Sequence, residues 1–294
     1  MTYEQFQQDV LDTLEKWMPG NTTFTVRQIV KPNDRVLDGL IISNPQTEIA
    51  PTIYLNPYYD ALSAGGASFD EIIENIFRPY KDNETTASFD QDEFLNWDRA
   101  KSHITYRLLN RKANEKFLED IPFLPYMDLA VIFTYLLTVE EAGQGSIVIH
   151  DCHAKNWGLE AKDLYSEAMK NTPSLLPPVC KPMSQMLDDL LPDAGEELPE
   201  DIPDMLVLSN KAKTYGAAAI LYTDLLKSIA EKMGSDFYVL PSSVHEVLLL
   251  PAGDKDIRND LSAMVREVNA SQVPDGEILS DHAYYYCAAD NSLC

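Results

Sequence analysis

Two serines, a histidine and a glutamate occur close together in residues 236–251, whose sequence is DFYVLPSSVHEVLLLP. Histidine beside a serine hydroxyl is an arrangement used in nucleophilic catalysis, because an imidazole with an ordinary pKa of ~6.5 exchanges protons near neutrality. The catalytic candidates are therefore His245 as general base and Ser242 or Ser243 as nucleophile. Glu246, or a distant acid such as Asp128, would support the histidine. This hypothesis describes a hydrolase or a transferase.

The same segment has a purely structural interpretation. Its aromatic, β-branched and aliphatic residues predict two short strands, 237–240 and 244–250, flanking a Pro-Ser-Ser turn. Successive side chains of a strand point to opposite faces, so His245 and Glu246 would serve one catalytic centre only from irregular backbone. The alternative is a half-buried histidine that is hydrogen-bonded to a neighbouring backbone group or hydroxyl.

Metal and cofactor chemistry finds little support in the sequence. His150, Cys152 and His153 are close together, and imidazole and thiolate are common metal ligands, but their spacing lacks the paired layout of a tetrahedral site. The four cysteines form no CxxC pair. The nucleophile elbow GxSxG, the phosphate loop GxxxxGK[ST], the dinucleotide motif GxGxxG and the zinc motif HExxH are all absent. We therefore expect no metal and no cofactor.

The composition predicts the kind of partner that the chain binds. Among 294 residues, 47 are acidic and 23 are basic, which gives a net charge of −24. Phosphate backbones and anionic membrane surfaces would be repelled, so we expect binding to neither nucleic acid nor membrane, while a protein partner stays open. The sequence lacks a secretory signal and an apolar run of the ~20 residues that span a bilayer. Together with unpaired cysteines, this predicts a cytoplasmic protein.

Helices and strands alternate in a pattern that predicts the fold class. Strand pairs followed by a helix occur three times, at about residues 22–78, 123–171 and 236–269. Short turns join the strands of each pair, and short turns favour antiparallel pairing. The sequence thus predicts an α+β fold with mainly antiparallel sheets, built from strand-pair-plus-helix units whose helices pack on the sheet faces.

Proline and charge divide the chain. Residues 173–182 contain four prolines, and residues 184–204 carry eight acids without a lysine or arginine. We predict an N-terminal α+β domain at 1–172, a Pro-rich and acidic linker or insertion at 173–204, and a C-terminal α+β domain at 205–294.

Some elements can be predicted individually. Thr2 with Gln5, and Ser68 with Glu71, are capping-box signatures that begin two helices. The run at 123–137, FLPYMDLAVIFTYLL, is apolar enough for one central strand segment, with Asp128 as its single charged residue in a structural role. A long helix is predicted from after residue 214 to 233, ended by Gly234.

Four segments of the sequence resemble a known family: FLPYMDLAVIF, NWGLEAKDLYSEAMKNT, FYVLPSSVHEVLLLP, and MVREVN followed by ILSDHAYYY. Through them the chain is similar, over nearly its whole length, to an uncharacterised bacterial family, domain of unknown function family 5688. A fainter likeness to family 1444 rests on the order of an LDLAV-like strand, a second strand, WG and a helix. Neither resemblance implies an activity or a catalytic residue. The leading hypothesis is a non-enzymatic protein-interaction or binding module, with the hydrolase or transferase as its alternative.

Overall fold

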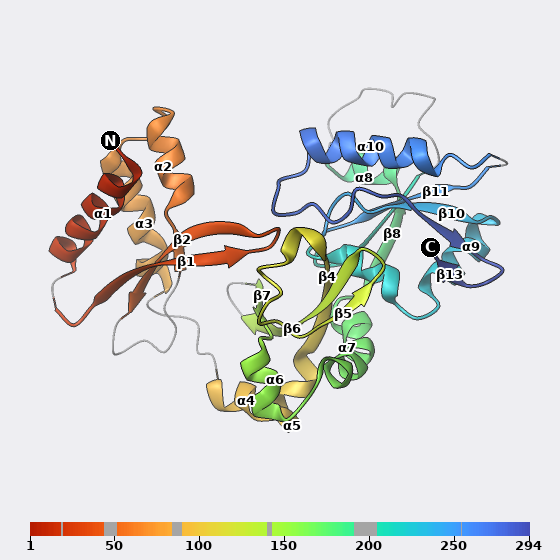
Figure 1. Cartoon of the computed structure of the whole chain (residues 1–294), viewed down its shortest axis with the longest axis horizontal. Helices are drawn as coiled ribbons and strands as arrows, with labels where there is room; N and C mark the ends of the chain where they lie inside the picture. The colour runs from red at the N-terminus through yellow and green to blue at the C-terminus, as the bar shows by residue number, and fades with distance from the viewer. Residues whose placement is uncertain (19, 44–51, 84–89, 140–142, 191–204, 254) are drawn as a thin grey trace. The chain divides into compact units, whose positions relative to one another are not determined.

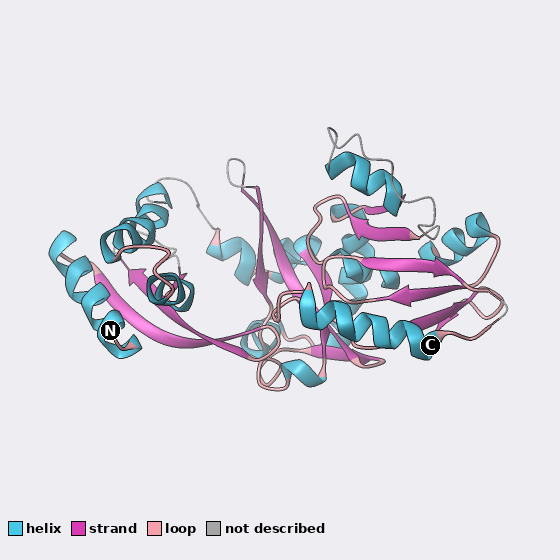
Figure 2. Ribbon diagram, turned by 90° about the horizontal axis from the view of Figure 1, so that it is seen from above, coloured by secondary structure: helices cyan, strands magenta, loops and turns pink. Residues whose placement is uncertain are grey.

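The computed structural model describes the chain except residues 19, 44–51, 84–89, 140–142, 191–204 and 254 (Figure 1). The chain forms two compact units, which are made of the ranges Met1–Lys31, Arg35–Asp92 and Val139–Gly143 in the first and Pro32–Asp34, Glu93–Thr138 and Gln144–Cys294 in the second. In both units helices lie against strands (Figure 2). Every strand pair whose register is described is antiparallel, which confirms the predicted α+β class.

The first unit has a three-stranded sheet in the order β1-β2-β3. Its elements are α1 (Tyr3–Trp17), β1 (Thr23–Lys31), β2 (Arg35–Ser43), β3 (Thr52–Tyr54), α2 (Asn56–Ser63) and α3 (Phe69–Asn83). Both predicted capping boxes are confirmed: the Gln5 backbone N–H donates to Thr2 Oγ1 at 3.3 Å, and the Ser68 backbone N–H donates to Glu71 Oε2 at 2.8 Å. These caps begin α1 and α3, whose apolar faces share one core with β2 and β3.

A four-stranded sheet opens the second unit, with the order β4-β6-β5 and β7 paired to β6. Short helices precede it, and two helices follow it: α4 (Gln91–Leu95), α5 (Trp97–Ala100), β4 (Ile104–Asn110), β5 (Phe123–Tyr126), β6 (Leu129–Val139), β7 (Gly143–Val148), α6 (Asp151–Trp157) and α7 (Ala161–Leu175). Helix α7 is joined to β4 by the buried Thr172, whose hydroxyl accepts the Tyr106 backbone N–H at 3.2 Å. The outer edge of β4 is thus partly satisfied by a side chain.

The second sheet of this unit has six strands in the order β13-β12-β10-β11-β9-β8. Its elements are β8 (Pro178–Pro182), α8 (Met183–Leu190), β9 (Leu206–Asn210), the 3₁₀ helix η3 (Gly216–Leu221), α9 (Leu225–Met233), β10 (Phe237–Leu240), β11 (Val247–Pro251), α10 (Arg258–Ser271), β12 (Tyr284–Cys287) and β13 (Ser292–Leu293). Helix α10 covers part of this sheet, because Leu261 and Val265 pack on Tyr238 and Leu240 of β10 (Figure 1).

The apolar run at 123–137 is two strands rather than one segment, which corrects the sequence prediction. The chain turns at Met127 and Asp128 between β5 and β6, and Met127 has a positive φ of 54°. Asp128 accepts hydrogen bonds from the hydroxyls of Ser280 at 2.7 Å and Tyr284 at 2.5 Å. The charge therefore lies in a turn that two donors satisfy, in agreement with the structural role predicted for it.

The predicted helix at 215–233 is also interrupted. A 3₁₀ helix, η3, comes first, Asp224 has a positive φ of 57°, and α9 follows and ends at Gly234 as predicted. Four successive residues of η3, Ala217 to Ile220, are almost fully buried. The chain leaves helical geometry at Tyr222, whose ψ is 128°, and again at Asp224, so η3 and α9 are separate elements.

Part of the predicted linker is regular structure. Strand β8 pairs with β9 from Pro178↔Asn210 to Pro182↔Leu206, and α8 follows directly. The acidic remainder, residues 191–204, lies outside the described residues. The boundary between the two units lies near residue 92, and residues 205–294 belong to the same unit as Glu93–Thr138 and the chain from Gln144 onward. The domain boundaries that the sequence predicts at residues 172 and 204 remain a prediction.

Candidate functional site

The segment that carries His245 and Glu246 has irregular backbone, and it is hydrogen-bonded to residues 217 and 277 on its two sides. Strand β11 begins at Val247, so His245 and Glu246 precede it, which corrects the prediction of a strand from residue 244. The Val244 backbone N–H donates to the Glu277 carbonyl at 2.9 Å, and the Val244 carbonyl accepts from Ala217 N–H at 3.2 Å. His245 and Glu246 are thus freed from strict strand alternation.

Neither serine hydroxyl is bonded to the His245 ring among the described residues. Ser243 is 6% exposed, and its Oγ accepts the backbone N–H of His245 at 3.0 Å, which is a local turn interaction. Ser242 accepts from Leu279 N–H through its carbonyl at 3.1 Å. The two hydroxyls and the imidazole are therefore close in sequence without forming a nucleophile–base pair.

The His245 ring has two other partners. Its Nδ1 accepts a hydrogen bond from the backbone N–H of Tyr215, with 3.3 Å between the two nitrogens. Its Nε2 lies 3.7 Å from Glu277 Oε2. The acid beside the histidine is therefore Glu277. Asp128, one of the two predicted supporting acids, bonds instead to Ser280 and Tyr284.

A buried arginine lies on the other side of Tyr215. Arg107 is 6% exposed in the middle of β4, and its guanidinium carbon is 4.2 Å from the centre of the Tyr215 ring. In turn, the Tyr215 ring lies 5.6 Å from the His245 ring at an angle of 32°. Arg107, Tyr215 and His245 therefore form three layers, with a cation–π contact between the first two.

Arg107 has no counter-charge in the part of the chain that the structure describes. Its Nε is buried without a hydrogen-bond partner, and no carboxylate pairs with the guanidinium there. Burial lowers the pKa of Arg107, and the neighbouring Tyr215 opposes that shift. Since arginine stays protonated in proteins, β4 holds an unpaired buried positive charge.

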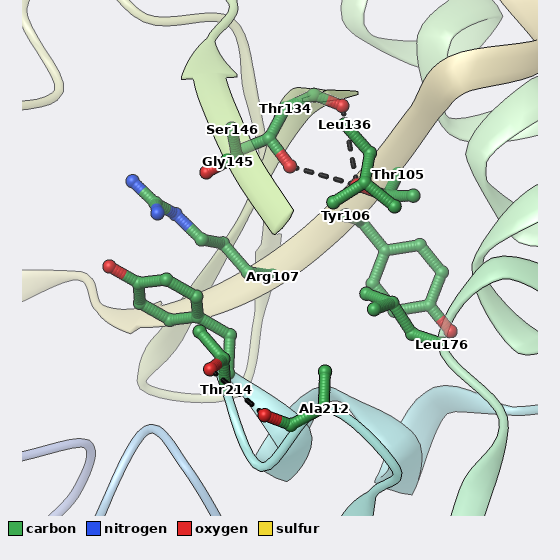
Figure 3. Close-up of a pocket in the computed structure, with 11 residues that line it drawn as sticks. Thr105, Tyr106, Arg107, Thr134, Leu136, Gly145, Ser146, Leu176, Ala212 and Thr214 are labelled. Atoms are coloured by element: carbon green, nitrogen blue, oxygen red, sulfur yellow. Dashed lines mark hydrogen bonds between the residues drawn. The ribbon is translucent and has the colours of Figure 1, made fainter. Parts of the chain in front are cut away.

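The guanidinium borders a cavity of about 380 Å³ (Figure 3). In Figure 3 the Arg107 side chain extends toward Gly145 and Ser146, while the Tyr106 ring lies on the Leu176 side. Among the described residues, the lining combines hydroxyls with apolar groups and includes no acidic side chain: Thr105, Tyr106, Arg107, Thr134, Leu136, Gly145, Ser146, Leu176, Ala212, Thr214 and Tyr215. In a chain with 47 acids, this is a cavity whose charged lining residue is positive.

Backbone packing fixes the position of Tyr215. Tyr215 has a positive φ of 51°, and Gly216 follows it against β9 and the His245 segment. A Cβ on Gly216 would lie 2.5 Å from the His245 carbonyl oxygen and 2.6 Å from Asn210 N, and it would also overlap Ser209 Oγ. Ser209 Oγ donates to the same His245 carbonyl at 2.7 Å. Only glycine fits against these atoms, so the stacked arrangement of Arg107, Tyr215 and His245 requires Gly216.

Two other cavities of the second unit have ordinary linings. One of about 430 Å³ is bordered by Tyr222 and Asp224, and one of about 540 Å³ by Asp128, Asp275 and Asp281. Of the described side chains that line the three cavities, only Tyr106 and Arg107 have a buried polar atom without a partner. We therefore place the candidate site at the cavity of about 380 Å³ beside Arg107.

The histidine and cysteine cluster of the sequence has a structural arrangement. The His150 backbone N–H donates to His153 Nδ1 at 3.1 Å, which caps α6, and His150 Nδ1 lies 2.9 Å from Asp120 Oδ2. Cys152 is exposed. Within the described ranges, no group of three or more histidine, cysteine or acidic side chains is placed to hold a metal ion.

His153 should titrate below its ordinary range. Partial burial lowers its pKa from 6.5, and the nearby His150 lowers it further, while Asp120 opposes them. The folded state therefore binds this proton more weakly than the unfolded state. Stability should be complete above pH ~6.5 and should fall as the pH drops through the folded pKa. Proton NMR of the ring measures this pKa, and a value at or above 6.5 would contradict the prediction. Glutamine at position 153 keeps a capping acceptor and should remove this pH dependence.

The fold and site together describe an α+β protein with a buried arginine beside a small cavity. Comparison of the sequence with known protein families matches residues 3–288 to a family described as "Family of unknown function (DUF5688)", and the chain belongs to this family. This confirms the resemblance stated above, whereas the likeness to family 1444 stays a prediction. Comparisons with curated proteins and with solved structures found no match.

Sequence reasoning missed the residues that form this site. Arg107 is one charge inside the apolar strand sequence ITYRLLN, and that contrast was the available signal. Glu277 and Tyr215 are 32 and 30 positions from His245, so no spacing rule connects them. Of the predicted residues, His245 contacts Tyr215 of the cavity lining, and the Ser243 hydroxyl accepts the His245 backbone N–H.

Proposed function

We propose that the chain is a binding protein without catalytic activity of its own, and that it takes a small ligand into the cavity beside Arg107. The observation that carries this proposal is the buried guanidinium of Arg107, which lacks a counter-charge among the described residues and borders that cavity. Burying a charge without a partner costs stability, so folded proteins keep such a group where function requires it.

The positions of the catalytic candidates support binding over catalysis. General-base catalysis of nucleophilic attack requires the base within about 3.2 Å of the hydroxyl that it deprotonates. The Ser243 hydroxyl instead accepts the His245 backbone N–H, and the His245 ring accepts from Tyr215 and faces Glu277. Both residues thus have structural partners that a catalytic step would have to break.

One observation favours the alternative, a hydrolase or transferase. His245 and Glu277 form a half-buried histidine–carboxylate pair, with 3.7 Å between Nε2 and Oε2. Such a pair orients an imidazole in many catalytic sites. In this alternative His245 would be the general base, Glu277 would replace Glu246 as its supporting acid, and Ser242 or Ser243 would need a different rotamer or backbone to reach the ring.

The location and partners proposed for the chain follow from its charge and family. No helix in the described part is long and apolar enough to cross a membrane. A net charge of −24 supports a cytoplasmic protein that binds neither nucleic acid nor membrane surfaces. A further protein partner and a bacterial origin belong to the same proposal.

Blocking the cavity tests the proposed function. Ser146 is an exposed residue of its lining, and tryptophan at this position should fill the space while leaving Arg107 in place. A thermal-shift screen of small metabolites should identify compounds that raise the Tm of the wild type and not that of Ser146→Trp. The matched control is Ser166→Trp, on an exposed site of α7 outside the cavity, which should respond like the wild type.

Activity assays test the alternative, a hydrolase or transferase. Ester and phosphoester substrates should not be turned over by the wild type above the background rate. An activity that His245→Ala and Ser243→Ala both abolish, while both variants remain folded by circular dichroism, would overturn the binding proposal and establish the hydrolase.

A further inference from the structure

The cavity beside Arg107 has the charge pattern of a site for a negative group. Of the described residues that line it, one has a charged side chain, Arg107, which is only 6% exposed. The described structure gives that guanidinium a ring contact and no hydrogen-bond acceptor for Nε. Its N–H groups form a planar fork that matches the two oxygens of a carboxylate or phosphate.

Tyr215 holds the guanidinium in place for such a ligand. The guanidinium carbon lies over the Tyr215 ring, 4.2 Å from the ring centre. A cation–π contact is electrostatic and requires no hydrogen-bond acceptor, so the N–H groups of the guanidinium can still donate to a ligand. Tyr215 is itself fixed through its N–H bond to His245 Nδ1 and through the close packing of Gly216. The donor is therefore oriented before any ligand arrives, which lowers the entropy cost of binding.

Hydroxyl and apolar groups of the lining suggest what else the ligand carries. The Thr105 hydroxyl bonds to Thr134 Oγ1 at 2.8 Å and also lies 3.3 Å from the Thr134 carbonyl, so this pair mostly satisfies itself. Ser146, at the exposed end, has no described partner and can donate. Leu136 and Leu176 supply apolar surface. A volume of about 380 Å³ is within the range of about 300–1,000 Å³ that small organic ligands occupy.

The acidic character of the whole chain does not prevent this binding. Charges on the surface are screened beyond about 8 Å at physiological ionic strength, whereas a buried guanidinium acts at contact distance in a less polar medium. The described residues of the lining include no carboxylate, so none of them competes with a ligand for Arg107. The surface charge should therefore slow the approach of an anion more than it weakens the bound state.

We propose that this cavity is a binding site for a small organic anion, a carboxylate or a phosphate ester with a compact apolar part, whose negative group is held by Arg107. This inference rests on the proposed function, because it names the ligand class of the same cavity. Ser146 would add a hydroxyl donor, and Leu136 and Leu176 would contact the apolar part.

Calorimetric titration with defined probes tests the inference. The probes are benzoate, phenyl phosphate and inorganic phosphate, with benzamide as a neutral compound of the shape of benzoate. We expect benzoate or phenyl phosphate to bind the wild type at least tenfold more tightly than benzamide, as for a hydrogen bond to a charged group. The stronger of the two identifies the carboxylate or the phosphate ester as the preferred anion.

Three variants assign the binding to Arg107. Arg107→Met should weaken anion binding at least tenfold, and Arg107→Lys should recover only part of it, because lysine keeps the charge without the planar fork. Arg111→Met makes the same change of net charge at an exposed residue outside the cavity and should bind like the wild type. Retained two-dimensional NMR spectra would show that each variant is folded.

The outcomes separate this inference from the proposed function. Equal binding of benzamide and benzoate that Ser146→Trp abolishes would leave the binding proposal standing and overturn the anion. Anion binding that Arg107→Met and Arg111→Met reduce equally would also overturn it, because net charge and not the site would be responsible. If none of the probes binds the wild type, the anion inference falls, while the metabolite screen still decides the proposed function.

Discussion

Replacing Gly216 with alanine is expected to lower the free energy of unfolding by about 3 kcal/mol, at the upper end of the usual cost of overpacking. The added Cβ would overlap Ser209 Oγ and would lie 2.5 Å from the His245 carbonyl oxygen and 2.6 Å from Asn210 N. Two of these three are backbone atoms, held by β9 and by the His245 segment, so relief requires the chain itself to move.

Chemical denaturation of Gly216→Ala measures this loss, and the chain offers a matched control. Gly253 has no heavy atom within 4 Å of an added Cβ and no positive φ, so Gly253→Ala should change stability by less than about 0.5 kcal/mol. If Gly216→Ala costs less than about 1 kcal/mol, η3 and the His245 segment are not packed as described. Loss of ligand binding in this variant should accompany the loss of stability, because Tyr215 would be displaced.

Replacing Arg107 with methionine is expected to make the protein more stable, by about 1–3 kcal/mol, while removing its anion site. Methionine fills much of the same volume with an adaptable apolar chain. The substitution removes a buried charge and a buried Nε that no described group satisfies. Binding sites commonly trade stability for function in this way.

Denaturation in a buffer without carboxylate or phosphate measures the effect of Arg107→Met. Arg111→Met, an exposed change of the same charge, should stay within about 0.5 kcal/mol of the wild type. A loss of more than about 1 kcal/mol in Arg107→Met would mean that the guanidinium stabilises the folded chain, as a paired buried charge does. If Arg107→Met is the more stable protein, as expected, benzoate should narrow the gap, because ligand binding stabilises only the wild type.

Local signals in the sequence predicted much of the fold. Capping boxes at Thr2 and Ser68 and the terminal glycine at 234 predicted three helix ends, because caps depend on residues within one turn. The antiparallel α+β class followed from short turns between strands. The helix that breaks at Asp224 could not be predicted in this way, because burial of residues 217–220 depends on segments far away in the sequence.

The candidate site was predicted only in part. The sequence indicated His245, but its partners come from residues 215 and 277, which the fold brings together. Pairing in catalytic or binding sites is defined in space, so the adjacent Ser243 was a plausible partner of the His245 ring, yet its hydroxyl accepts the His245 backbone N–H instead. The single arginine of β4 was visible in the sequence, yet its lack of a counter-charge is a property of the folded chain.

NMR observation of the Arg107 side chain tests the central claim most directly. A buried Nε–H without a partner exchanges slowly with water, and its resonance would be assigned by its loss in Arg107→Met. Titration with benzoate or phenyl phosphate should shift this resonance strongly and saturably, as a charged acceptor approaches, while benzamide and the resonance of Arg111 should show no such effect. An Arg107 Nε–H resonance that does not respond to either anion would contradict the account of this cavity as an anion-binding site.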